Sequence, residues 1–293
     1  MNDRELVAAL RERSGANDSV AYAHRVFAET AALARRHGLS APKSVLEIGP
    51  GANLGSLFAF AASGVQELAG LDVVAAPPPP PEFYETLRDF LMAVDGTTWW
   101  RTWAVREPGR VDFPPVSSFP SAADLLARIR YVAGVSSETL PFEDGRFDLV
   151  YSVAALEHVP DPAGTLAEMR RVLRPGGLTV HEIDLKHHGS ADPLKFLEWT
   201  DEEWARRATR YGGDVSLRKI LDGGFGGEIF CNRLRREGWT RLFREAGFAL
   251  EQVEPVIVLD ASLVKPKRFA PPFRDLPDGE LAVLAIRVAA RRP

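Results

Sequence analysis

The chain has 293 residues but only one cysteine, Cys231. One thiol cannot form a disulfide within the chain, and it cannot supply the several cysteine ligands of a multi-cysteine zinc site. This cysteine usage suits a reducing cytoplasm. A single cysteine in an ordinary segment is expected to be a small packing residue.

Long apolar runs are also missing. No segment approaches the roughly 18 apolar residues that a membrane-spanning helix requires. The first residues, MNDRELVAALRERSG, form a charged amphipathic pattern without the apolar core of a signal peptide. The sequence therefore predicts a cytoplasmic protein with no membrane partner.

Charge of one sign is not in excess. The chain carries 36 basic and 40 acidic residues, which gives a formal net charge of −4. Arginine pairs such as Arg170-Arg171 and Arg206-Arg207 have acidic residues nearby, which is typical of solvated helix faces. We expect no nucleic-acid partner, because a nucleic-acid groove would need a concentrated basic surface.

What the chain does contain is an alternation of short apolar segments with helical patterns. A strand followed by a helix, repeated along the chain, indicates an α/β fold with a doubly wound, mostly parallel sheet, here of about seven strands. The expected strands are residues 44–48, 68–73, 129–134, 147–152, 178–184, 248–259 and 280–289, and the expected helices include 3–13, 19–37, 53–64, 162–173, 201–210, 214–221 and 238–246.

Two segments interrupt the alternation and are candidate helical lids, residues 77–127 and 185–237. The first begins with a stiff run of five prolines and contains Trp99, Trp100 and Trp103. These tryptophans could form the wall of a pocket or the interface of a homodimer, and the sequence favours neither.

The segment VLEIGPGANLG, residues 45–55, combines a strand, a glycine-rich turn and the start of a helix. Glycines allow a tight turn and a close approach to a ligand, and the helix start offers free N–H groups. The pattern is not a P-loop, and Leu54 occupies the third glycine position of a dinucleotide fingerprint. Glu47 would repel a pyrophosphate, so this turn suits a cationic ligand.

These residues resemble the first motif of class I methyltransferases that use S-adenosyl-L-methionine (SAM), in particular the bacterial methyltransferase type 11 proteins. Leu71-Asp72-Val73 resembles the second motif of that class. The later motifs of the class are matched, in the right order, by residues 138–142, 145–150, 155–159 and 168–177. The resemblance extends over residues 44–185 and implies a Rossmann-like fold.

The resemblance also implies roles for individual residues. Gly49 and Gly51 would line the methionine portion of SAM, with Glu47 holding its amino group, Asp72 binding the ribose hydroxyls and Val73 against the adenine. At the adenine edge would lie Ser136, Ser137 and Glu138, and facing the sulfonium would lie Ser152 and Val153. Ser136 stands where the class usually has an aspartate, so a weaker contact with the adenine amino group is expected.

The catalytic chemistry requires few residues, because the methyl group of a sulfonium is already activated and orientation supplies much of the acceleration. A hydroxyl acceptor also needs a group that takes its proton. The candidates are His187 and His188, which follow the fifth expected strand, and His158 after the fourth. His187 and His188 could instead be surface loop residues or join Asp184 in a metal site, but the sequence shows no dense acidic cluster and we expect no metal.

The sequence thus predicts a SAM-dependent methyltransferase that releases S-adenosyl-L-homocysteine. Residues 44–293 would form the SAM-binding domain, and the helices within residues 1–43 would cover the cofactor. The expected acceptor is a small molecule of the kind used in natural-product biosynthesis, with oxygen favoured over nitrogen or carbon. The alternatives are methylation of RNA or protein, and a SAM-binding protein that transfers no methyl group.

Overall fold

The computed structural model describes residues 19–51, 53–74, 79–93, 119–188, 190–209, 228–265 and 267–293. The helices expected at residues 3–13 and 214–221 and the tryptophans at positions 99, 100 and 103 lie outside these ranges. Among the described helices, none combines the length and the apolar character needed to cross a bilayer.

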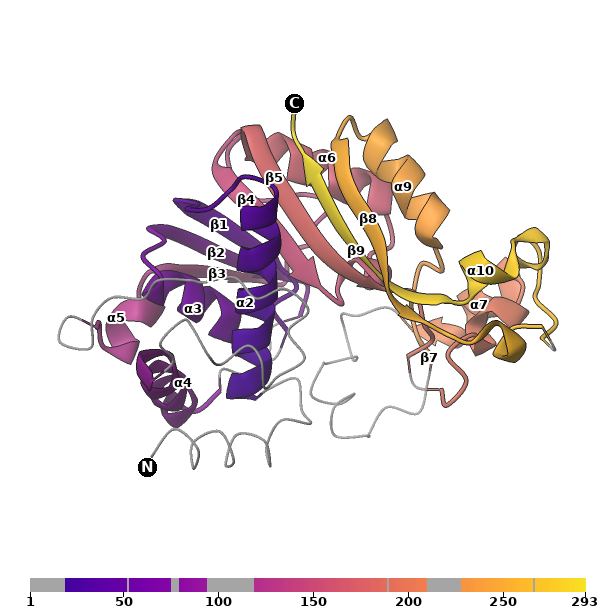
Figure 1. Cartoon of the computed structure of the whole chain (residues 1–293), viewed down its shortest axis with the longest axis horizontal. Coiled ribbons are helices and arrows are strands. Elements are labelled where there is room, and N and C mark those ends of the chain that lie inside the picture. The colour runs from indigo at the N-terminus through magenta and orange to yellow at the C-terminus, as the bar shows by residue number, and fades with distance from the viewer. Residues whose placement is uncertain are drawn as a thin grey trace.

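A seven-stranded sheet forms the centre of the molecule, with the strand order β3-β2-β1-β4-β5-β9-β8 (Figure 1). The pairs formed by β1 to β5 are parallel, whereas β9 runs antiparallel between β5 and β8. The strands are β1 Ser44–Ile48, β2 Glu67–Asp72, β3 Ile129–Ala133, β4 Phe147–Val153, β5 Leu173–Asp184, β8 Ala249–Val258 and β9 Val283–Arg291. The predicted doubly wound, mostly parallel, Rossmann-like sheet is confirmed.

The central strand β1 shows why the alternation of strands and helices could be recognised in the sequence. All five of its residues are buried, including Glu47, because β2 and β4 flank the strand and helices cover both of its faces. A strand covered on both faces is expected to be almost continuously apolar instead of alternating. The short apolar run before the glycines is the sequence signature of that position.

Helices cover the two faces of the sheet separately. One face carries α2 Val20–Arg36, α3 Gly55–Ala62, α4 Pro81–Ala93 and α5 Ala122–Leu126, and the other carries α6 Pro162–Val172 and α9 Arg236–Glu245. The start of α2 is capped by Ser19, whose hydroxyl accepts a hydrogen bond from the Tyr22 amide at 3.1 Å. The helix ends before Gly38, whose φ of +80° glycine adopts without strain.

A third apolar cluster forms a small lobe beyond the ends of β8 and β9 (Figure 1). Phe196 and Trp204 come from the expected 185–237 insertion, whereas Val264 and Phe273 come from the connection between β8 and β9. The elements of the lobe are the short helices Lys195–Glu198, α7 Asp201–Arg207, Ala261–Leu263, Phe273–Asp275 and α10 Asp278–Leu281, with strands β6 Ala208–Thr209 and β7 Glu228–Ile229. The lobe is therefore built from two segments, of which the sequence pattern revealed one.

Candidate functional site

The glycine turn between β1 and α3 is held tightly against its neighbours. The Gly49 amide donates to the carbonyl of Leu71 at 2.8 Å, and both Gly49 and Gly51 have a φ of +70°. A Cβ atom added to Gly49 would lie 2.6 Å from the Cβ of Ala155, which is too close for real side chains. The turn can therefore take this path only with glycine at position 49 and a small residue opposite it.

Asp72, at the end of β2, fixes the same turn from the neighbouring strand. Its Oδ2 accepts a hydrogen bond from the Gly51 amide and its Oδ1 accepts one from the Val74 amide, each at 3.1 Å. Burial raises the pKa of Asp72 above its ordinary value, and these amide donors partly oppose the rise. One carboxylate thus orders the glycine turn and faces the space beside it.

That space is a cavity of about 260 Å³ at the carboxyl ends of the parallel strands, where open α/β sheets bind their ligands. It brings together most of the predicted cofactor residues and one of the predicted catalytic histidines. Its lining consists of Ile48, Gly49, Gly51, Leu71, Asp72, Val73, Val74, Ser136, Ser137, Glu138, Ala154, Ala155, His158, Val159 and Pro160. The lining is mainly apolar with a few polar groups, which is typical of a small-molecule site.

The predicted adenine edge, residues 136–138, is ordered by local hydrogen bonds. The Ser136 hydroxyl accepts from the Glu138 amide at 3.2 Å, and the Ser137 hydroxyl is 3.0 Å from that of Thr165. Glu138 Oε1 accepts from the Asp161 amide at 3.0 Å. These bonds fix the wall of the cavity and leave the roles of the three residues toward a cofactor as predictions.

Glu47 lies beneath the turn and does not line the cavity. Its Oε2 accepts a hydrogen bond from the Ser56 hydroxyl at 2.6 Å, and the Tyr151 hydroxyl donates to the same Ser56 oxygen at 2.9 Å. Burial raises the pKa of Glu47 to about 7, and the nearby Asp72 carboxylate adds to the rise. The contact between Glu47 and the amino group of SAM stays a prediction, and from this position it would have to pass through an intermediate group.

The raised pKa of Glu47 predicts a pH-dependent stability. Between its ordinary value of 4.5 and about 7, the folded chain keeps a proton that the unfolded chain releases. Stability from this residue is therefore full below pH 4.5 and is lost as the pH rises through 7. Glu47→Gln does not titrate, so its stability lacks this dependence on pH. The free energy of unfolding of the variant minus that of the wild type should therefore be about 2 kcal/mol larger at pH 8 than at pH 5.

Urea unfolding of both proteins across this pH range measures the difference. Glu85→Gln, which removes an exposed glutamate on α4, controls for the loss of one charge. Parallel pH profiles for wild type and Glu47→Gln would show that Glu47 does not titrate in this window.

The two residues predicted to face the sulfonium do not line the cavity. Ser152 is buried, and its hydroxyl lies 2.7 Å from Nδ1 of His181, the strand residue paired with it on β5. Val153 packs against the apolar cluster beneath α2 and α3. The chain bends away at Ala154, whose φ is +51°, so the residues at the cavity are Ala154 and Ala155.

The three candidate catalytic histidines occupy different surroundings. His158, in the short helix Leu156–His158, lines the cavity. His187 is buried in the lobe, stacked on Phe196 with ring centroids 5.3 Å apart, and its Nε2 lies 2.7 Å from Oε2 of Glu228. His188 does not line the cavity but packs edge-to-face on the His158 ring at 4.8 Å. Of the three, only His158 lines the cavity.

Several lining residues were not singled out from the sequence, namely Ala154, Ala155, Val159 and Pro160. The available signal was the pair of small residues directly after β4, since a close approach to the Gly49 turn requires small side chains there. Pro160, which precedes α6, could also be noted in the sequence, but its position relative to the glycine turn depends on how β1 and β4 pair.

Two other residues have structural roles. Asp148, at the start of β4, accepts from the Lys43 amide at 2.5 Å and pairs with Arg174 at 2.6 Å. Arg233, between β7 and α9, is buried and donates to the carbonyls of Phe196 and Trp199. It also pairs with Asp201, so its guanidinium is already committed to holding the lobe together.

The fold and the placement of the motifs are those of the class I SAM-dependent methyltransferases. A family model described as a methyltransferase domain matches residues 22–253, and the chain belongs to this family. The match covers the sheet from β1 to β5 together with α2 and α9.

Curated relatives share parts of the chain. An uncharacterized 37.1 kDa protein of transposon TN4556 from Streptomyces fradiae is 39% identical over 119 residues, 40% of this chain and 29% of that protein. An uncharacterized methyltransferase of Mycobacterium sp. (strain JLS) is 44% identical over 107 residues, 32% of this chain and 41% of that protein. This chain thus matches less than half the length of either relative.

Two solved structures illustrate the likeness in fold. A SAM-dependent methyltransferase of Mesorhizobium loti is 18% identical, with a TM-score of 0.43 over 89% of this chain and 96% of that chain. A geranyl diphosphate methyltransferase solved with SAM is 15% identical, with a TM-score of 0.45 over 98% of this chain and 89% of that chain.

Proposed function

We propose that this chain transfers the methyl group of SAM to a hydroxyl group of a small molecule by direct in-line displacement, and releases S-adenosyl-L-homocysteine. The observation that carries the proposal is the cavity itself. One wall of the cavity is the glycine turn that Asp72 orders, and the other wall contains His158. A cofactor seated on the turn would leave its methyl group between these walls.

The apolar part of the lining suits the cofactor. Leu71, Val73 and Val74 offer contacts for a flat heterocycle, while the Asp72 carboxylate offers an acceptor for hydroxyl groups. The glycine turn presents no side chain that would compete with the methionine portion. A carboxylate this close to the turn disfavours a phosphate and favours a cation.

A second, more open cavity of about 760 Å³ provides room for an acceptor. Both cavities include Pro160 in their linings, and the second extends along the lobe past Trp204, Phe230 and Asn232. Its aromatic and amide side chains fit an organic molecule with both apolar and polar parts. We therefore place the acceptor on the lobe side of His158.

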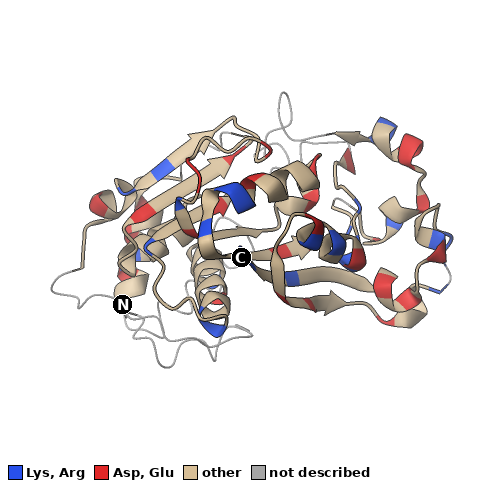
Figure 2. Cartoon of the chain, turned by 90° about the horizontal axis from the view of Figure 1, so that it is seen from above, with Lys and Arg blue, Asp and Glu red and all other residues tan. Residues whose placement is uncertain are grey.

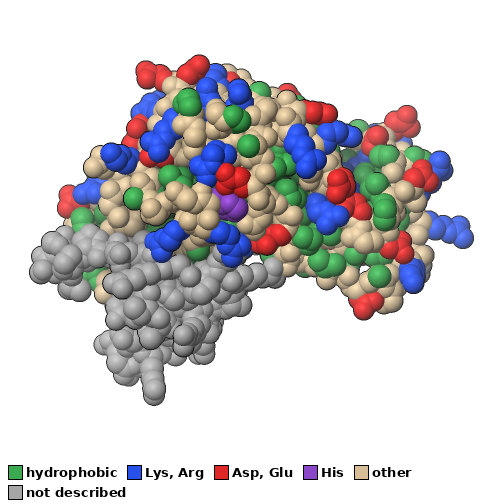
Figure 3. All heavy atoms as spheres, turned by 45° about the horizontal axis from the view of Figure 1, so that its top comes forward, with side chains coloured by type: hydrophobic (Ala, Val, Ile, Leu, Met, Phe, Trp, Pro, Cys, Tyr) green, Lys and Arg blue, Asp and Glu red, His purple; other side chains and the backbone are tan. Residues whose placement is uncertain are grey.

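Surface charge supports a small acceptor over a nucleic acid. Basic and acidic residues are interspersed along the described helices and strands in Figure 2, and blue and red side chains adjoin one another on the face seen in Figure 3. A nucleic-acid site would need a concentrated basic surface to neutralise several phosphates. The relatives include a tocopherol O-methyltransferase of Arabidopsis thaliana, 57% identical over 37 residues, 13% of this chain.

The test uses the full chain with SAM and a panel of acceptors that differ only in the reacting atom: hydroxyl, amine, carboxylate and activated carbon. We expect S-adenosyl-L-homocysteine to form only when a hydroxyl acceptor is present, with the methyl group on oxygen by mass spectrometry and NMR. Methylation of an RNA or protein fraction instead would overturn the small-molecule proposal. SAM binding with no methyl transfer to any of these acceptors would favour a protein that only binds SAM.

A further inference from the structure

A cluster of ionisable side chains lies behind the His158 wall of the cavity. Glu157 and His158 follow β4, while Asp184 ends β5 and His188 follows it. Because β4 and β5 are paired in parallel, their carboxyl ends meet at one edge of the sheet. Residues from two separate segments thus converge, and potential metal-ligand atoms of Glu157, Asp184 and His188 all lie within 4.8 Å of one another.

Glu157 is the observation that points to a ligand. Its side chain is only 2% exposed, and neither carboxylate oxygen has a hydrogen-bond partner of good geometry. A buried carboxylate without a partner is costly, whereas the same carboxylate bound to a cation is not.

The spacing of the side-chain atoms is that of ligands around one ion. Nε2 of His188 lies 3.3 Å from Oδ2 of Asp184 and 3.7 Å from Oε1 of Glu157, and Nε2 of His158 lies 3.8 Å from the same Glu157 oxygen. The 3.3 Å separation allows a hydrogen bond between His188 and Asp184, whereas the 3.7 and 3.8 Å separations from Glu157 are too long for hydrogen bonds. Two ligands of a tetrahedral ion with bonds of about 2.0–2.1 Å are about 3.3–3.4 Å apart.

The hydrogen bonding of His158 presents the right nitrogen. Its Nδ1 lies 2.7 Å from the carbonyl oxygen of Phe230, so this nitrogen carries the proton and Nε2 keeps its lone pair. A carbonyl behind the outer nitrogen is the usual arrangement for a histidine that binds a metal.

We propose that Glu157, Asp184 and His188, with His158 as the fourth ligand, bind one divalent transition-metal ion such as Zn²⁺ at the edge of the cofactor cavity. Two imidazoles and two carboxylates fit zinc, manganese or iron, whereas magnesium and calcium prefer oxygen ligands alone. The sequence predicted no metal because its acidic residues are dispersed along the chain. The fold brings two of them together.

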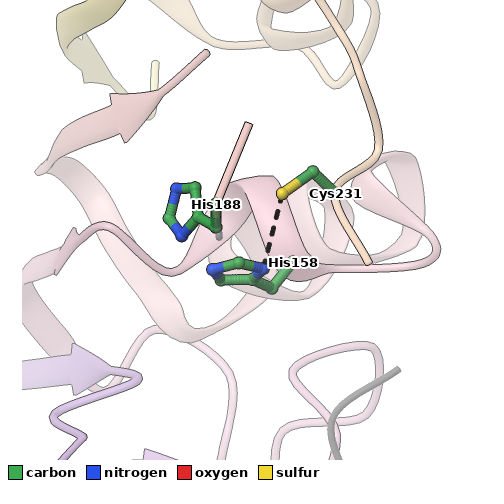
Figure 4. A group of neighbouring side chains, drawn as sticks. All are labelled: His158, His188 and Cys231. Carbon is green, nitrogen blue, oxygen red and sulfur yellow. Dashed lines mark hydrogen bonds between the residues drawn. The ribbon is translucent and has the colours of Figure 1, made fainter. Parts of the chain in front are cut away.

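Two neighbours limit the site. Figure 4 shows Cys231 beside His158, with its Sγ 3.8 Å from Nδ1, the nitrogen already bonded to the Phe230 carbonyl. Sγ of Cys231 lies within 4.8 Å of ligand atoms of His158 and His188, but it approaches the Nδ1 side of the His158 ring and not the Nε2 that is closest to Glu157. Nζ of Lys186 lies 2.7 Å from Oδ2 of Asp184 and competes with the ion, but its side chain is 37% exposed and can move into solvent.

An ion in this position would lie where the acceptor is placed, since His158 lines the cavity. It would lower the pKa of an acceptor hydroxyl and so assist its deprotonation. This role depends on the proposed function, whereas binding of the ion does not.

The test is therefore made without acceptor. The full chain is treated with a chelator, dialysed and titrated with Zn²⁺ by calorimetry, and Co²⁺ is then used as a spectroscopic probe. We expect one equivalent to bind, with visible bands of four-coordinate cobalt and no thiolate-to-cobalt charge transfer. Glu157→Gln and His188→Ala should each weaken Zn²⁺ binding at least tenfold.

His37→Ala is the matched control, because His37 also pairs with a carboxylate, Glu251 at 2.9 Å, but at the end of α2. It should bind Zn²⁺ as the wild type does. Thermal melting should rise with Zn²⁺ in wild type and His37→Ala and stay unchanged in Glu157→Gln. Failure of the wild type to bind Zn²⁺, Mn²⁺ or Fe²⁺, or wild-type affinity in both cluster variants, would overturn the proposal whatever the acceptor proves to be.

Discussion

Replacing Asp72 with alanine is expected to lower the affinity of the chain for SAM by about 100-fold. Unpaired hydroxyl groups on a bound ligand cost about 1–3 kcal/mol. The structure places the expected loss at the upper end of that range, because Asp72 also accepts hydrogen bonds from the Gly51 and Val74 amides. The substitution thus removes a ligand contact and releases the glycine turn together.

Calorimetric titration with SAM and with S-adenosyl-L-homocysteine measures this loss. Asp148→Asn is the matched control, because Asp148 is also buried and also binds backbone amides, but at the start of β4 and not beside the cavity. That variant should lose stability and keep its SAM affinity. An Asp72→Ala protein that folds and binds SAM as tightly as the wild type would contradict the placement of the cofactor.

Replacing Arg287 with methionine should lower the free energy of unfolding by about 3–5 kcal/mol, the usual cost of removing one partner of a buried ion pair. Arg287, on β9, is 4% exposed, and its Nη2 lies 2.9 Å from Glu29 Oε2 on α2 and 2.7 Å from Glu182 Oε2 on β5. The variant removes the buried cation between the two carboxylates and leaves the partly exposed Arg25, 3.3 Å from Glu29 Oε2, as a cation beside them. It therefore weakens the attachment of α2 to the sheet.

Urea unfolding at neutral pH measures the effect. The triple variant Arg287→Met, Glu29→Gln, Glu182→Gln should recover most of the lost stability, because it also removes the two carboxylate charges that Arg287 pairs with. A single Arg287→Met variant within about 0.5 kcal/mol of the wild type would show that this ion pair contributes little.

The fold could be predicted from the sequence because its strands and turns are indicated by local sequence patterns. The apolar run at residues 44–48 and the proline and glycines at positions 175–177 mark strands and turns through burial and backbone conformation. The lobe was only half visible, since the connection between β8 and β9 has no periodic pattern of its own. The apolar residues of this connection become buried only when the chain folds and Val264 and Phe273 pack in one cluster with Phe196.

Site residues could be predicted from the sequence where they belong to one continuous motif, but not where two separate segments come together. Gly49, Gly51 and Asp72 were predicted at the cavity and line it, because a strand, a turn and the next strand end fix them. Ser152 was predicted there too, but the bend at Ala154 gives that position to Ala155. No local pattern reports a bend that depends on the neighbouring turn.

By itself the sequence determined the positions of the core strands, the glycine turn and the aspartate beside it, because residue spacing and backbone freedom are properties of a single segment. Only the tertiary structure decided which of three histidines reaches the cavity and that Glu157 lies against Asp184 and His188. Those contacts arise when parallel strands bring their ends to one edge, so distances between residues far apart in the chain are set by the sheet.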